Sequence, residues 1–229
     1  MSVDQPAVVL LSGGMDSAVV LAMARAEGYR VHALTVDYGQ RHRVELEAAE
    51  RVAAAVGVEA HMVLEVDLTA VAISALTGTG VIPKSERQPG DDPIPPTYVP
   101  ARNTLLLSMA LSWAESIGAR DLFIGVSAVD YSGYPDCRPE FIAAFEEVAN
   151  RGTRAHNDPE RPYRVHAPLL ELTKEQTVRT GLDLGLDFGL TWSCYDPGPD
   201  GAPCLECDAC RLRRKGFDGA GVDDPVRGR

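Results

Sequence analysis

Residues 12–17 have the sequence SGGMDS and join two apolar stretches, one over residues 7–11 and a longer one that begins at Ala18. The first stretch is long enough for one buried strand, and the second is typical of a helix. The two glycines between them permit positive φ and close backbone approach, and a helix N-terminus presents N–H groups and a partial positive charge. The segment is therefore predicted to bind an anion, and we expect phosphate. The Lys-Ser/Thr ending of a Walker A loop is missing, so it is not the phosphate loop of kinases and GTPases.

Four of the five cysteines lie close together in the C-terminal part of the chain: Cys194, Cys204, Cys207 and Cys210. The two-residue gaps between the last three allow neighbouring sulfurs to converge on one ion. Four thiolates are typical of a closed structural Zn²⁺ site, which has no open position for substrate, so we assign this zinc to folding. An iron–sulfur cluster and metal-free cysteines are the alternatives.

The composition limits the classes of partner. The chain has 229 residues, of which 45% are hydrophobic, and a net charge of −11. The length predicts one domain, or one domain with a small appendage. The acidic balance gives no general attraction for nucleic acid or anionic lipid, and no apolar stretch approaches the ~20 residues that span a bilayer. No N-terminal signal pattern occurs, and the clustered cysteines favour a reducing compartment, so we expect a cytoplasmic protein with no direct nucleic-acid or membrane partner.

The first 126 residues alternate between β-rich and helical patterns. We predict strands over residues 7–11, 31–36, 61–66 and 121–126 and helices over residues 43–56 and 102–117. In the first of these helices, Val44, Ala48, Val52 and Val56 form the apolar face, and Glu45 counts among the charged residues elsewhere. The alternation predicts an α/β fold with a doubly wound, mainly parallel sheet, whose ligand lies beyond the carboxyl ends of the strands. Three segments follow such ends: residues 12–17, 37–42 and 127–138.

The rest of the chain contains fewer regular patterns. Residues 77–100 are rich in Gly and Pro and are predicted to form a long loop near the ligand, and residues 139–150 a helix. Residues 151–164 are polar, and we expect a mobile excursion there. Thr173 to Gln176 resembles a capping box that opens a helix to about Leu184. We expect an α/β domain over residues 1–190, a zinc-binding segment packed on it over residues 191–217, and a flexible tail over residues 218–229.

SGGMDS resembles the signature of the ATP pyrophosphatases, or PP-loop enzymes. This resemblance implies the adenine nucleotide alpha-hydrolase-like fold, in which the loop holds the β- and γ-phosphates of ATP while ATP is cut between the α- and β-phosphates. From about residue 7 to about residue 217 the chain is similar to one family of this group, the 7-cyano-7-deazaguanine synthases of queuosine biosynthesis. The similar segments are LSGGMDSAVVL, TVDYGQRHRVE, TYVPARNTLLLSMA, GVSAVDYSGYPDCRPEF, LTKEQT, TWSCY and CLECDACRLRRKGF. DYSGYPDCR is the most specific of them.

This resemblance implies an ATP-dependent carbon–nitrogen ligase that acts as a homodimer. It would convert 7-carboxy-7-deazaguanine and ammonia to 7-cyano-7-deazaguanine through an adenylated carboxylate and an amide. Adenylation suits this chemistry because a carboxylate is a poor electrophile until it carries a good leaving group. The alternatives are a related ligase that joins the activated base to a protein or other amine, a zinc-containing nucleotide-binding module without catalysis, and a transfer RNA sulfurtransferase. The net charge counts against the last of these.

The resemblance also implies site residues. The catalytic set is Ser12, Asp16, Ser17, Arg102 and Lys174. The ATP-binding set is Leu11, Ser12, Gly13, Gly14, Met15, Asp16, Ser17, Asp37, Tyr38, Arg102, Gly125 and Lys174. Lys174 and Arg102 are expected on the triphosphate, and Asp16 near a Mg²⁺ ion bound with ATP. Ordinary structural roles remain open for each of them: a solvated surface lysine for Lys174, an ion pair near a helix start for Arg102, and an acid in the first turn of a helix for Asp16.

The deazaguanine base is expected to contact Asp130, Tyr131, Tyr134, Asp136 and Arg138. One of the two aspartates would accept hydrogen bonds from the N1–H and amino groups of the base, the tyrosines would stack on it, and the arginine would pair with the substrate carboxylate. Turn or packing roles for these residues remain open. Within the same segment, Cys137 is expected to be a packed residue and not a nucleophile. His42 is a candidate for proton transfer during amination.

Overall fold

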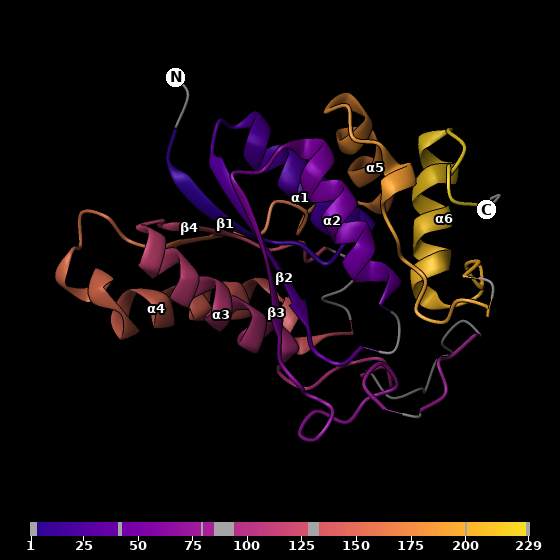
Figure 1. The fold of residues 1–229 in the computed structure, drawn as a ribbon, viewed down its shortest axis with the longest axis horizontal. Coiled ribbons are helices and arrows are strands. Elements are labelled where there is room, and N and C mark those ends of the chain that lie inside the picture. Colours follow the sequence, from indigo (N-terminus) through magenta and orange to yellow (C-terminus); the bar gives the residue numbers. More distant parts are fainter. Residues whose placement is uncertain are drawn as a thin grey trace.

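The computed structural model describes residues 4–40, 43–78, 80–84, 94–127, 133–199 and 201–227. Within these residues, five parallel strands form one sheet in the order β3-β2-β1-β4-β5 (Figure 1). The strands are β1 (Pro6–Leu10), β2 (Arg30–Asp37), β3 (Ala60–Glu65), β4 (Asp121–Phe123) and β5 (Arg164–His166). The order runs outward in both directions from β1 and β4, which confirms the predicted doubly wound sheet.

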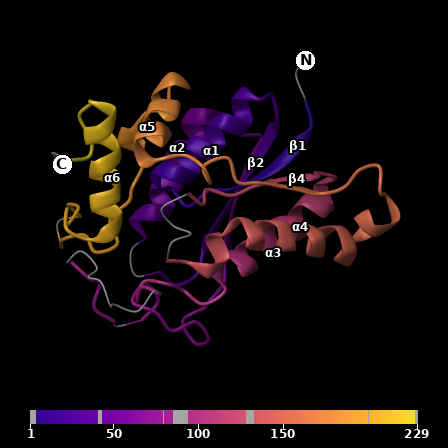
Figure 2. The same cartoon turned by 180° about the vertical axis from the view of Figure 1, so that it is seen from behind.

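Helices cover both faces of the sheet (Figures 1 and 2). They are α1 (Met15–Ala26), α2 (Val44–Val56), α3 (Arg102–Ile117), α4 (Pro139–Gly152), α5 (Lys174–Asp183) and α6 (Asp208–Ala220). Helices α1 and α2 pack on one face, α3 and α4 pack on the other, and α6 lies against α5 beyond α1. The helices predicted over residues 43–56 and 102–117 are confirmed as α2 and α3.

The central strand supplies residues to two hydrophobic cores, because successive side chains of a strand point to opposite faces. Val8 lies in the core beneath α3 and α4, with Leu107. Val9 lies in the core beneath α1, with Val19 and Phe188. Each of these side chains is at most 2% exposed, and burial of one such side chain contributes about 1.5–3 kcal/mol. The continuous apolar sequence of β1 is therefore explained by burial on both faces.

The predicted capping box is present at the start of α5. The backbone N–H of Thr173 donates to Gln176 Oε1 at 2.8 Å, and the backbone N–H of Gln176 donates to Thr173 Oγ1 at 3.2 Å. These reciprocal bonds fix the first turn of α5. Lys174 is the first residue of this helix, so the capping box also sets the position of its side chain.

Residues 151–164, expected to be a mobile excursion, pack against α4 instead. They include a 3₁₀ helix, Arg154–Asn157, with Ala155 buried. Tyr163 is fully buried, and its backbone N–H donates to Asn150 Oδ1 at 2.7 Å. The prediction failed because two buried anchors outweigh the polar composition of the rest of the segment.

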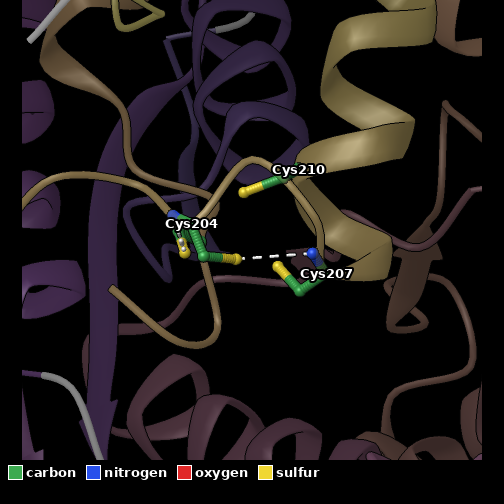
Figure 3. Close-up of side chains that lie close together, drawn as sticks. Cys204, Cys207 and Cys210 are labelled. Atoms are coloured by element: carbon green, nitrogen blue, oxygen red, sulfur yellow. Dashed lines mark hydrogen bonds between the residues drawn. The ribbon is translucent and has the colours of Figure 1, made fainter. Parts of the chain in front are cut away.

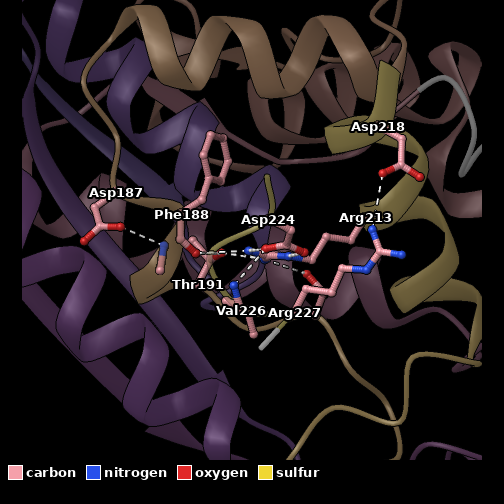
Figure 4. A network of polar contacts seen from close by, with 10 residues as sticks. Asp187, Phe188, Thr191, Arg213, Asp218, Asp224, Val226 and Arg227 are labelled. Atoms are coloured by element: carbon pink, nitrogen blue, oxygen red, sulfur yellow. Dashed lines mark hydrogen bonds and ion pairs between the residues drawn. The ribbon is translucent and has the colours of Figure 1, made fainter. Parts of the chain in front are cut away.

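The residues after Asp218, expected to be a flexible tail, also differ from the prediction. They complete α6, and the chain then turns back so that Asp224 meets Arg213 of the same helix (Figure 4). Two guanidinium nitrogens contact the two carboxylate oxygens at 2.8 and 2.9 Å, and the side chains are only 6% and 9% exposed. Arg213 also donates to Thr191 Oγ1 at 2.7 Å and to the carbonyl of Phe188 at 3.1 Å. One buried guanidinium therefore joins α6, the C-terminal segment and the chain that follows α5.

Among the described residues, no helix combines the length and the apolar content that crossing a bilayer requires. The domain boundary expected at residue 190 stays a prediction.

We predict that Asp224→Ala destabilises the fold by about 3–5 kcal/mol, because it leaves a buried guanidinium without its carboxylate partner. Urea denaturation measures this change in the free energy of unfolding. Asp218→Ala is the control, because its 3.5 Å pair with Arg227 is 60% and 54% exposed and should contribute less than about 1 kcal/mol. Equal and small losses in the two variants would contradict the prediction.

Candidate functional site

A cavity of about 230 Å³ lies beyond the carboxyl ends of β1, β2 and β4, where the strand order reverses. Ligands of doubly wound sheets bind at this position. All three segments predicted there contribute residues to its wall: Ser12 and Gly14 to Ser17 from the first, Tyr38 and Gln40 from the second, and Tyr134 and Cys137 from the third. The wall contains these members of the expected ATP-binding set: Leu11, Ser12, Gly14, Met15, Asp16, Ser17, Tyr38, Arg102, Gly125 and Lys174.

The SGG turn is held by its own side chains and by α2. Gly13 has φ +83°, and a Cβ atom there would lie 2.2 Å from the carbonyl oxygen of Glu45, so only glycine fits. Gly14 has φ −76°, so positive φ is required at one of the two glycines and not at both. Ser17 Oγ accepts the backbone N–H of Ser12 at 3.2 Å and donates to the carbonyl of Gly14 at 3.1 Å. The shape of the turn is therefore fixed by contacts within the protein.

The turn leads directly into the N-terminus of α1. Gly14 is the N-cap residue and supplies no side-chain cap, so the helix dipole and the first-turn N–H groups are directed at the cavity. Gly125 closes the other side, because a Cβ atom there would lie 3.0 Å from the backbone nitrogen of Ser17. The backbone N–H of Trp192 donates to the carbonyl of Gly13 at 2.9 Å. This arrangement is suited to binding a phosphate group.

Lys174 reaches this loop from α5 and is only 4% exposed. Its Nζ donates to Asp16 Oδ2 at 2.7 Å and to Ser127 Oγ at 2.9 Å. A buried ammonium requires such partners, because its desolvation is otherwise costly. The structural alternative of a solvated surface lysine is thereby excluded.

Arg102 is the first residue of α3 and lines the same cavity. Its Nη1 donates to the hydroxyl of Tyr38 at 3.4 Å, and its guanidinium carbon lies 5.9 Å from the centroid of that ring. Burial raises the pKa of Tyr38, and the positive charge of Arg102 opposes part of this rise. The tyrosine is therefore neutral at physiological pH and accepts a hydrogen bond from the arginine.

Glu45, which sequence reasoning placed among the solvated residues of its helix, also lines the cavity. Burial raises its pKa to about 7, and the positive charge of Arg102 limits the rise. The residues three, four and seven positions later, Ala48, Ala49 and Val52, are all buried. That spacing places Glu45 on the inward face of α2, and it was the signal in the sequence that could have identified it.

Asp37 does not line the cavity, although we expected it to contact ATP. Its carboxylate lies 2.5 Å from Arg43 Nη2 and accepts the backbone N–H of Gly39 at 3.2 Å. Gly13 also lies behind the cavity wall, covered by α2.

Only some of the residues expected to bind the base line the cavity. Tyr134 lines the cavity, and its hydroxyl lies 2.8 Å from Thr97 Oγ1. Cys137 lines it as well, is 3% exposed and accepts a hydrogen bond from Asn103 Nδ2 at 3.2 Å, as a packed residue would. Asp130 and Tyr131 lie outside the described residues, as does His42.

Asp136 and Arg138 are not part of the cavity wall. Asp136 is buried and accepts the backbone N–H of Asn103 at 3.0 Å, so its carboxylate caps the first turn of α3. Arg138 is exposed and precedes α4.

Several cavity residues were not predicted: Asn103, Trp192, Ser193, Tyr195 and Arg213. Four of them lie in or beside the cysteine segment. We expected this segment to pack on the α/β domain, but nothing in its local pattern indicates that it folds back onto the phosphate loop.

The four predicted metal ligands do converge. The sulfurs of Cys194, Cys204, Cys207 and Cys210 all lie within 4.8 Å of one another. Figure 3 shows three of these side chains, with the backbone N–H of Cys207 donating to the sulfur of Cys204 at 3.4 Å. The sulfur of Cys194 accepts backbone N–H groups of Cys204 at 3.2 Å and of Asp196 at 3.3 Å.

These distances fit one tetrahedral metal ion. Four sulfurs at about 2.3 Å from an ion lie about 3.8 Å apart, which the cluster reaches with small adjustments. The N–H groups stabilise thiolate charge and orient the ligands. The cluster can therefore hold a metal ion, and its closed shape leaves no position for substrate.

We predict that Gly13→Ala is far more damaging than Gly57→Ala. Both glycines have left-handed φ, +83° and +74°, which costs other residues about 1–2 kcal/mol. A Cβ atom at Gly57 meets nothing within 4 Å, whereas at Gly13 it meets the backbone of α2. We expect Gly13→Ala to lose about 1–3 kcal/mol more in urea denaturation, and equal losses would contradict the proposed packing.

We predict that Cys207→Ser loses the bound metal and lowers Tm by on the order of 10 °C. Elemental analysis and thermal unfolding measure the two effects. Cys137→Ser is the control, because that thiol lies outside the cluster and the variant should keep the metal. A Cys207→Ser protein with full metal content and the parent's Tm would show that the cluster has no role in folding.

Comparisons with known proteins identify the family of this chain. The family model for "Queuosine biosynthesis protein QueC" matches residues 6–221. A relative from Syntrophus aciditrophicus is 55% identical over 99% of this chain and 98% of its own length. One from Geobacter sulfurreducens is 59% identical, covering 96% and 92%, and one from Xanthomonas campestris pv. campestris is 60% identical, covering 96% of both. All three carry the name 7-cyano-7-deazaguanine synthase. The chain therefore belongs to the QueC family of queuosine biosynthesis proteins.

Proposed function

We propose that this protein is an ATP-dependent ligase that converts 7-carboxy-7-deazaguanine and ammonia to 7-cyano-7-deazaguanine. The name shared by relatives that are 55–60% identical over nearly the whole chain supports this substrate. The observation that carries the reaction type is the phosphate loop at the N-terminus of α1, beside a buried lysine. In the first stage the substrate carboxylate attacks the α-phosphorus of ATP, and ammonia then displaces AMP to form an amide. In the second stage the amide is activated by ATP and loses AMP to form the nitrile.

The phosphate loop would hold the pyrophosphate that leaves. Negative charge develops on that group as the bond between the α- and β-phosphates breaks, and preformed N–H groups stabilise it. Ser12 and Ser17 fix the shape of the loop through their hydroxyl groups. Lys174 and Arg102 would add positive charge on two sides of the triphosphate.

Asp16 is the residue we propose for a magnesium ion that accompanies ATP. It lines the cavity next to the loop, its side chain is 26% exposed, and carboxylate oxygen is the ligand type that Mg²⁺ prefers. Such an ion would supply charge neutralisation to the phosphates. Lys174 compensates the negative charge of the same carboxylate.

We propose zinc for the four-cysteine site, because four thiolates within 4.8 Å of one another are the typical donor set of structural Zn²⁺. All five cysteines are free thiols, which supports a reducing compartment and the expected cytoplasmic location. The expected homodimer rests on the family resemblance alone.

For the base we propose Tyr134 as a stacking or covering residue, with Asp130 and Tyr131 as further candidates. Asp136 and Arg138 would need to reorient to contact the base.

Transfer of the activated base to a protein amine is the alternative, and no feature of the described residues favours it. The experiment that separates the two is incubation with ATP, 7-carboxy-7-deazaguanine and ammonium, followed by mass spectrometry. Nitrile and AMP in a fixed ratio support the synthase. AMP formation without nitrile, or a mass shift on an added protein, would contradict it.

We predict that Ser12→Ala and Asp16→Asn each reduce AMP formation by at least about 100-fold, because both residues shape the triphosphate site. Ser12→Ala should leave Tm nearly unchanged, whereas Asp16→Asn should also lower Tm, because it removes the carboxylate that compensates the buried Lys174 ammonium. Ser108→Ala is the control, because that serine lies on α3 away from the cavity and bonds only the carbonyl of Thr104. Near-parent turnover in both loop variants would mean that the phosphates bind elsewhere.

A further inference from the structure

The two acidic side chains on the cavity wall differ in whether a cationic side chain lies within ion-pair distance. Among the described residues, the wall carries three cations and two acids: Arg102, Lys174, Arg213, Asp16 and Glu45. Asp16 is paired with Lys174 at 2.7 Å. Among the described residues, the carboxylate of Glu45 has no ion-pair partner within 4.0 Å and makes no hydrogen bond. One carboxylate in a cavity suited to phosphates is therefore left without a cationic partner within ion-pair distance among these residues.

Glu45 lies close to the phosphate loop. It belongs to the first turn of α2, and its carbonyl oxygen is the atom that excludes a side chain at Gly13. The charged and titratable groups that act on its carboxylate are Arg102 from α3 and the neutral phenol of Tyr38 after β2. Burial raises its pKa to about 7, which is well placed for accepting a proton near neutral pH.

The proposed reaction must remove protons from nitrogen. Ammonia exists mainly as ammonium at neutral pH, and only the deprotonated form can attack. When it attacks the acyl adenylate, a C–N bond forms, the C–O bond to AMP breaks, and the nitrogen loses one further proton to give the amide. In the second stage the amide oxygen attacks the α-phosphorus of another ATP, and the bond between the α- and β-phosphates breaks to release pyrophosphate. The C–O bond then breaks to release AMP, and the nitrogen loses both of its protons to give the nitrile.

The cations that would hold ATP repel an ammonium ion, so its site needs an anion that phosphate binding does not consume. We propose that Glu45 binds the incoming ammonium and accepts the protons that the nitrogen loses. This inference rests on the proposed function and adds a catalytic residue and an ammonium site to it. A purely structural glutamate, which orients Arg102 for ATP, is the competing explanation.

The two explanations differ in which half-reaction they affect. Exchange of labelled pyrophosphate into ATP, dependent on 7-carboxy-7-deazaguanine and measured without ammonium, reports adenylation alone. Nitrile formation at varied ammonium reports the steps in which nitrogen loses protons. We expect Glu45→Gln to keep the exchange rate within about threefold of the parent and to lower kcat/KM for ammonium by about 10²–10⁴-fold.

Glu47→Gln is the matched control. Glu47 lies in the same turn of α2 but is exposed, and its carboxylate lies 3.9 Å from the guanidinium of Arg51. The rates of pyrophosphate exchange and of nitrile formation in Glu47→Gln should equal those of the parent. Hydroxylamine provides a second readout, because it is a weaker base than ammonia and is largely deprotonated at neutral pH. Hydroxamate formation by Glu45→Gln should therefore fall much less than amide formation.

Three results would overturn the inference. Nitrile formation by Glu45→Gln within threefold of the parent would show that no proton passes to this residue. Parallel loss of exchange and nitrile formation would assign Glu45 to ATP binding. Normal ammonium dependence in Glu45→Gln with loss in His42→Gln would assign proton transfer to His42. Absence of exchange in the parent would instead contradict the proposed function itself.

Discussion

The close packing around Gly13 is the constraint on which the rest of the site depends. Its positive φ turns the chain from β1 into α1, and the missing side chain lets the first turn of α2 rest on the loop. Its carbonyl also accepts the N–H of Trp192, from a segment nearly at the other end of the chain. One residue without a Cβ therefore sets the distances between the helix N-terminus, Glu45 on α2 and the segment that leads to the cysteines.

Two buried cations in this part of the molecule are each compensated by a carboxylate. Lys174 is paired with Asp16 at the phosphate loop, and Arg213 with Asp224 behind it. The cysteine sulfurs accept backbone N–H groups, which favours the thiolates that a metal requires. Arg213 lines the cavity and anchors the chain before Cys194, so the metal segment and the phosphate loop share one set of contacts. We infer that the metal supports the site by holding this segment in place.

Features with a local physical cause could be predicted from the sequence. The capping box at Thr173 and the helix over residues 102–117 follow from neighbouring side chains and from hydrophobic spacing. The four cysteines could be recognised because ligand spacing within one segment limits their geometry. Polar composition was a poorer guide: residues 151–164 and the residues after Asp218 look solvated, yet Tyr163 and Asp224 are buried.

The sequence by itself determined the turn between strand and helix, the order of the elements and the metal ligands, because each depends on residues that lie close together in the chain; even the four cysteines fall between positions 194 and 210. Only the tertiary structure decided which side chains share the cavity. Lys174 meets Asp16 across 158 positions, Arg102 meets Tyr38 across 64, and Asp37 turns toward Arg43 and away from the site. The inward direction of Glu45 likewise depends on the packing of α2 against Gly13. Such contacts arise from how helices pack on the sheet, and no local pattern of residues specifies them.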